Sequence, residues 1–125
     1  MNVTIIIYTS DQEKATGFYR TLLGADPILA VPGMTEFELN EGTKLGIMPA
    51  AGIVRILEGE ISEPICSQDH VKCELYLSKE NADQLYENSM KAGGISLGGF
   101  KLRNWGEEVA YCLDLDGNLI AFARR

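Results

Sequence analysis

The chain has 125 residues, of which 46% are hydrophobic and 23% are charged. This length suits one domain with a sizeable core, and the composition excludes a disordered or fibrous protein. The formal net charge of −7, with no basic cluster beyond Arg124 and Arg125, disfavours nucleic acid and anionic membranes as partners. We expect a cytoplasmic protein, because the apolar run at residues 3–7 is too short to cross a bilayer and no basic segment precedes it.

The first half of the chain predicts one strand, one helix and three short strands. Residues 2–8 are β-branched and apolar, which predicts the first strand. Ser10 and Glu13 have the spacing of a capping box at a helix start, and Gly24 is placed to end that helix. The apolar residues between these ends recur at helical spacing: Ala15, Phe18, Tyr19, Leu22 and Leu23. Turn signals separate three further predicted strands, at residues 27–31, 35–40 and 44–48.

The second half repeats this order. Residues 71–77 predict a strand, and Asn81 is placed to cap a helix that ends at Gly93. The composition of residues 114–118 favours a hairpin turn over a calcium loop. Three strands are predicted around this turn, at residues 95–97, 107–113 and 118–123. Between the halves, residues 50–69 are rich in Gly, Pro and Glu and predict a linker with at most one short helical turn.

The repeated pattern predicts one α+β domain over residues 1–125, built from two βαβββ modules. Module 1 is expected at about residues 1–49, the linker at about 50–69 and module 2 at about 70–125. Two such modules can form a curved mixed sheet around a cleft, with the helices outside. Because side chains alternate along a strand and the helices must cover the more apolar faces, the opposite faces are expected to line the cleft.

Aromatic and charged side chains are concentrated among the residues expected in the cleft. Aromatic rings can stack on a flat ligand, and a carboxylate between apolar walls attracts a cation. Glu74 is the candidate for a catalytic base. In an alternative interpretation, Lys72 and Glu74 form an internal ion pair and the tyrosines only pack. The predicted ligand-binding cleft consists of Tyr8, Met48, Lys72, Glu74, Tyr76, Trp105, Tyr111 and Ala121.

The cysteines and the single histidine predict no site of their own. Cys66, Cys73 and Cys112 are odd in number and form no CxxC pair, so we expect free thiols and neither a disulfide framework nor a zinc site. His70 is expected at an exposed loop end, and one histidine excludes a histidine-rich metal set within one chain.

Two segments resemble the glyoxalase / bleomycin-resistance / dioxygenase superfamily, also called the vicinal-oxygen-chelate superfamily. Residues 11–24 resemble its helix motif D-x-E-K-x-x-x-F-Y-x-x-x-L-G. Trp105-Gly106 and residues 114–120 resemble its W-G … D-P-D-G-N-x-I-E ending, with Leu115 in place of the usual proline. The resemblance spans essentially the whole chain and implies the paired βαβββ fold. It is less specific for activity, because the superfamily includes isomerases, dioxygenases, thiol transferases and drug-binding proteins.

Metalloenzymes of this superfamily hold a divalent ion through a His on the first strand, a Glu on the fourth, a His or Glu on the fifth and a Glu on the eighth. Open positions let the ion chelate two substrate oxygens. At most one of the four ligands is present in this chain, so we expect no metal and no other cofactor. The resemblance places the ligands at Thr4, at Gly46 or Met48, at Lys72 or Glu74, and at Ala121.

The resemblance therefore favours a metal-free binding protein of the bleomycin-resistance kind, which sequesters a small aromatic or cationic molecule. Relatives commonly complete the cleft across a dimer interface, so a homodimer is expected. Two alternatives stay open. One is a lyase or isomerase of glyoxalase type (lactoylglutathione-lyase-like), including a metal-independent relative that uses Glu74 and a tyrosine. The other is an orphan interaction domain whose own side chains fill the cleft.

Overall fold

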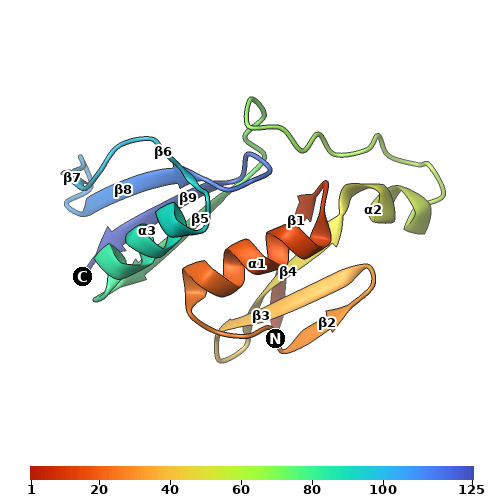
Figure 1. The fold of residues 1–125 in the computed structure, drawn as a ribbon, viewed down its shortest axis with the longest axis horizontal. Coiled ribbons are helices and arrows are strands. Elements are labelled where there is room, and N and C mark those ends of the chain that lie inside the picture. The colour runs from red at the N-terminus through yellow and green to blue at the C-terminus, as the bar shows by residue number, and fades with distance from the viewer.

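In a computed structural model that describes all 125 residues, each half of the chain forms its own mixed sheet (Figure 1). The first sheet has the order β1-β4-β3-β2, and the second has the order β5-β9-β8-β6, with β7 also paired to β8. Only the β1–β4 and β5–β9 pairs are parallel. The strands are β1 (Val3–Thr9), β2 (Leu29–Val31), β3 (Met34–Asn40), β4 (Thr43–Pro49), β5 (Glu74–Lys79), β6 (Ile95–Ser96), β7 (Lys101–Leu102), β8 (Glu108–Leu113) and β9 (Leu119–Arg124).

Two of the three helices lie side by side, each on the sheet of its own module. Helices α1 (Gln12–Leu23) and α3 (Ala82–Lys91) pack against each other, and each covers one face of the sheet of its own module (Figure 1). The predicted α+β class with two βαβββ modules is confirmed, and the strands form two separate sheets. None of the helices is both long and apolar enough to cross a membrane. One core joins both modules: Ile7, Ala15, Phe18, Tyr19, Leu22, Phe37, Leu45, Ile47, Leu75, Ala82, Leu85, Cys112, Ile120 and Phe122.

The other face of each sheet carries no helix from α1 or α3 and points away from this shared core; we call these two surfaces the open faces. The core residues of β1 and β4, such as Ile7 and Ile47, alternate with residues of the open face, such as Tyr8 and Met48. The predicted alternation is thus confirmed at Ile7 and Ile47, whereas Val3 and Ile5, predicted on the same face as Ile7, are 40% and 41% exposed. The helix-covered faces of both sheets therefore contribute to one core.

The start of α1 differs from the predicted capping box. Asp11 is the N-cap, and its Oδ1 accepts a hydrogen bond from the Lys14 N–H at 3.0 Å. Ser10 instead donates from its N–H and its Oγ to Asp116 Oδ1, at 3.0 and 3.1 Å. The capping-box prediction is wrong because a partner more than 100 residues away engages Ser10. Gly24 ends the helix in the left-handed conformation, at φ 64°, as predicted.

Three other boundaries differ from the prediction. Strand β5 begins at Glu74 and not at residue 71, because Lys72 is drawn to the β8–β9 turn, where its Nζ donates to the Asp116 carbonyl at 2.6 Å. Helix α2 (Ala50–Ile56) has seven residues and is longer than the single turn expected in the linker. Strand β7 is absent from the predicted strands, and its two residues are too few for a period-two pattern.

The turn between β8 and β9 ties the two modules together. Its hairpin is confirmed, with the Asp114 N–H donating to the Asn118 carbonyl at 2.9 Å. The Asp114 carboxylate is 2% exposed and accepts hydrogen bonds from Tyr19 Oη at 2.6 Å, from the Asp116 and Asn118 N–H groups at 2.8 and 2.9 Å, and from Asn118 Nδ2 at 2.8 Å. Because Tyr19 comes from α1, this buried carboxylate connects module 1 to module 2.

Tyr19→Phe is expected to change how stability depends on alkaline pH. Burial, and then the neighbouring Asp114 carboxylate, raise the pKa of Tyr19 well above its ordinary value of 10.0. The folded state therefore favours the protonated phenol, and this stabilisation is full below about pH 10 and is lost as the pH rises further. Urea unfolding should show that the variant is less stable by about 1–2 kcal/mol at neutral pH and that its stability falls less above pH 10. An equally steep alkaline fall in the variant would contradict this.

The three cysteines are free thiols, as predicted. Cys112 is fully buried in the core, and this burial raises the pKa of its thiol to about 11. Cys66 and Cys73 are half-buried, and burial raises the pKa of both. None of the three has the lowered pKa that marks a reactive nucleophile.

Candidate functional site

The open face of the second sheet carries aromatic side chains on β5 and β8, the two strands that flank β9, whose own side chains on this face are small. In the register of β5, β9 and β8, Tyr76 and Tyr111 both pair with Ala121, so the two rings flank an alanine on the same face. The next row contains Ala123 and Val109, which are fully buried together with Ala121. Small side chains on β9 thus form an apolar floor between two tyrosines.

The turn between β7 and β8, residues 103–107, folds over this floor; we call it the β7–β8 turn. On one side, Trp105 Nε1 donates to Tyr76 Oη at 2.8 Å, and Tyr76 Oη donates to Glu107 Oε1 at 2.5 Å. On the other side, the Arg103 guanidinium carbon lies 5.1 Å from the centroid of the Tyr111 ring. The turn therefore spans from β8 to β5 across β9, and Trp105 stays 56% exposed.

The polar groups of this face are arranged around Tyr76. Desolvation and the hydrogen bond to Glu107 raise the pKa of Tyr76, so the phenol is protonated at neutral pH. Glu74, in the row beside Tyr76, is exposed, and no hydrogen bond or ion pair engages its carboxylate. Lys72 makes no ion pair with Glu74, because its Nζ donates to the carbonyls of His70 and Asp116.

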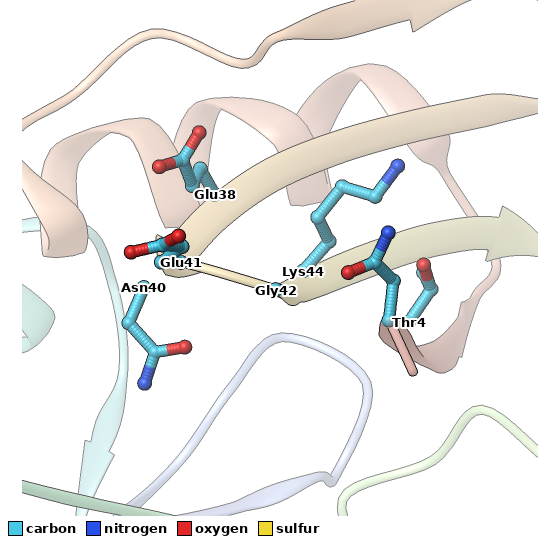
Figure 2. Close-up of a pocket in the computed structure, with 7 residues that line it drawn as sticks. Thr4, Glu38, Asn40, Glu41, Gly42 and Lys44 are labelled. Carbon is cyan, nitrogen blue, oxygen red and sulfur yellow. The ribbon is translucent and has the colours of Figure 1, made fainter.

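The open face of the first sheet is more polar. A hollow of about 310 Å³ lies at its end and is lined only by polar residues and one glycine (Figure 2). In that view, Glu38, Asn40 and Glu41 lie on one side and Thr4 and Lys44 on the other. Lys44 Nζ also forms an ion pair with Glu36 at 3.2 Å. Nothing in this hollow resembles the aromatic walls of the second sheet.

The ligand positions of the superfamily's metalloenzymes do not form a metal site in this chain. Thr4 and Gly46 lie on the same open face and offer neither an imidazole nor a carboxylate, and a Cβ at Gly46 would already lie 3.3 Å from Thr4 Cγ2 and 3.4 Å from Ile6. Ala121 is fully buried and offers no donor. No three His, Cys, Asp or Glu side chains come close enough together to hold a metal ion. The donor set therefore does not fit the metal that the superfamily's enzymes use.

The predicted cleft residues fall into three groups. Glu74, Tyr76, Trp105, Tyr111 and Ala121 come together on the open face of the second sheet. Tyr8 and Met48 pair with each other on the open face of the first sheet. Met48 is only 8% exposed, because α2 begins beside it and covers it. Lys72 lies on neither face, because the β8–β9 turn holds it.

Arg103 and Glu107 belong to the site but are missing from the predicted set. Both flank Trp105 in the β7–β8 turn, and the hydrogen bonds from the Arg103 N–H to the Glu107 carbonyl and from the Gly106 N–H to the Arg103 carbonyl close the turn. The only signal in the sequence was that two charged residues lie within two positions of the single tryptophan. Strand β7, which sets the direction of these side chains, is too short to predict.

The two βαβββ modules define a paired-module α+β domain, and comparison with known proteins gives its family. The family model of the Glyoxalase/Bleomycin resistance protein/Dioxygenase superfamily matches residues 3–122. The chain therefore belongs to this superfamily, as the resemblance of its motifs implied. No curated protein sequence matches the chain.

Solved structures share the fold at low sequence identity. A glyoxalase-related enzyme from Fulvimarina pelagi is 19% identical, with a TM-score of 0.84 over 100% of this chain and 88% of the other. A glyoxalase / bleomycin resistance protein from Catenulispora acidiphila is 21% identical, with a TM-score of 0.69 over 100% and 98%. A bleomycin-binding protein in complex with bleomycin is 17% identical, with a TM-score of 0.70 over 100% and 98%. At these identities the likeness shows the fold alone.

Proposed function

We propose that this chain is a metal-free binding protein that sequesters a small aromatic or cationic molecule. The observation that carries the proposal is the open face of the second sheet, where Tyr76, Trp105 and Tyr111 surround an apolar floor. Aromatic walls with a few placed polar groups are typical of small-molecule sites. The bleomycin-binding protein of the same fold supports binding as a function that this architecture can serve.

The proposed site is completed by a second copy of the chain. Apart from the β7–β8 turn, no element of the chain covers the open face of the second sheet, so a ligand there is enclosed only if another surface covers it. Strands β1 and β5 are edge strands, and Val3 and Ile5 on β1 are 40% and 41% exposed. Unpaired edges with exposed apolar residues favour association. Sedimentation velocity should therefore give a homodimer; a monomer at all concentrations would oppose this part.

A thermal-shift panel tests the proposal. Planar aromatic cations, neutral aromatic compounds and bleomycin should include at least one that raises the melting temperature, because a ligand that binds only the folded state stabilises it. In the variant Tyr111→Ala, which removes one aromatic wall, that shift should be lost. The matched control Leu115→Ala shortens an apolar side chain of the β8–β9 turn, which lies beside Gly93 at the end of α3 and outside both open faces. A panel without any shift would favour an orphan interaction domain instead.

A second candidate function, isomerase activity of the glyoxalase type, is favoured by Glu74 alone. Its unpartnered carboxylate lies beside Tyr76 on the same face and could accept a proton from a bound substrate. Turnover of the methylglyoxal–glutathione adduct that disappears in Glu74→Gln would support this function. Absence of turnover in a protein that binds the panel compounds would leave sequestration.

A further inference from the structure

We propose that Arg103 occupies, from within the chain, a binding site for a planar cation on the open face of the second sheet. The β7–β8 turn would then act as a lid that must leave this face before a ligand enters. The inference rests on the proposed binding function and adds the charge and shape of the ligand, together with a device that regulates access.

Arg103 makes contacts that a ligand could also make. Its guanidinium lies over the Tyr111 ring at 5.1 Å, and its Nη2 and Nε donate to the Val109 carbonyl at 2.8 and 3.3 Å. None of the four ion pairs of the protein involves Arg103. The planar guanidinium of Arg103 is therefore held only by the Tyr111 ring and by one carbonyl acceptor. An aryl guanidinium or a similar flat cation offers the same groups.

The β7–β8 turn has few attachments to the sheet that it covers. Apart from Arg103, it is held by the exposed hydrogen bonds of Trp105 and Glu107 with Tyr76. Gly106 has a φ of 93° and no atom within 4 Å of a Cβ built there, so its surroundings are open. Segments with exposed hydrogen bonds and few buried contacts open at low cost. Opening would expose Val109, Ala121 and Ala123, which are now fully buried.

The charges left on this face after Arg103 moves away favour a cation. Glu74 leaves one carboxylate in the row beside Tyr76, whereas Glu107, which accepts a hydrogen bond from Tyr76 in the closed turn, moves with the lid. Lys101 is the remaining cation on this face, at the outer edge, where it pairs with Val109. Carboxylates beside aromatic rings attract and orient a cation, whereas a neutral molecule of the same shape gains only the stacking.

The emission of Trp105 reports directly on the lid, because it is the only tryptophan in the chain. We would titrate the protein with phenylguanidinium and with its neutral isostere phenylurea, and follow this emission. In the wild type, phenylguanidinium should change the emission and should bind more tightly than phenylurea. In Arg103→Met, which keeps an apolar side chain over the alanines, the affinity for phenylguanidinium should rise about two- to five-fold, because the internal competitor is gone.

Lys101→Met is the matched control, since it removes one positive charge from the same face without a contact to Tyr111. The inference is overturned if both variants gain affinity equally, because general electrostatics would then explain the gain. It is also overturned if Arg103→Met binds no more tightly than the wild type, or if phenylurea binds as tightly as phenylguanidinium. If panel compounds bind but Trp105 does not respond to phenylguanidinium, this inference fails and the proposed function stands. If no compound of the panel binds, the proposed function itself fails.

Discussion

Asp114→Ala is expected to lower the free energy of unfolding by about 4 kcal/mol. The carboxylate accepts four hydrogen bonds and is 2% exposed, so its removal leaves buried donors on Tyr19, Asp116 and Asn118 without an acceptor. Each unsatisfied buried donor costs about 1–3 kcal/mol, partly recovered if water enters the gap. Because one of the donors comes from α1, the variant should also weaken the contact between the modules. Urea unfolding followed by circular dichroism measures the change.

Asp26→Ala is the matched control for this experiment. Asp26 forms an ion pair with Arg20 at 3.0 Å, but its side chain is 87% exposed. Exposed ion pairs of this kind contribute about 0–1 kcal/mol. A loss of stability in Asp114→Ala no larger than in Asp26→Ala would show that the buried network does not hold the modules together.

Gly117→Ala is expected to cost about 3 kcal/mol or more, for two separate reasons. Gly117 has a φ of 86°, a left-handed conformation that costs a residue with a Cβ about 1–2 kcal/mol. A Cβ at this position would also lie only 2.0 Å from the Ser67 carbonyl oxygen, so the backbone of the linker would have to move. Backbone, unlike a flexible side chain, cannot yield cheaply. Thermal or urea unfolding should therefore show a marked loss of stability.

Gly33→Ala separates the two reasons. Gly33 has a φ of 96°, but no atom lies within 4 Å of a Cβ built there. We expect this control to lose only the conformational cost, about 1 kcal/mol. An equal loss in the two variants would mean that the linker does not pack on the β8–β9 turn as described.

Local patterns predicted most of the fold. The two-residue alternation of the strands placed Ile7, Phe37, Leu45 and Ile120 on the helix-covered faces, where the core contains them. Gly24 ended α1 because a left-handed residue is needed at that point, and sequence alone shows this. Such features depend on neighbours within a few positions, so they can be read from one sequence.

Features that depend on distant partners could not be predicted. Ser10 had the spacing of a cap, but Asp116 engages it from the other module. Lys72 fitted the alternation of a strand, but the carbonyl of Asp116 holds it outside β5. Arg103 gave no sign of its position over Tyr111, because its direction follows from the short strand β7. In each case a long-range hydrogen bond or a ring contact, and not local propensity, sets the position.

We propose that ligand binding occurs on the open faces and is completed by two copies of the chain. Hydrogen–deuterium exchange, with and without the compound that gives the largest thermal shift, tests it most directly. We predict added protection in Glu74–Lys79 and Glu108–Leu113 of the second sheet, in the β7–β8 turn, and also in Val3–Thr9 of the first sheet. Protection confined to the hollow of about 460 Å³ between the start of α2 and residues 63–66, around Ala51 and Ile65, would contradict the claim.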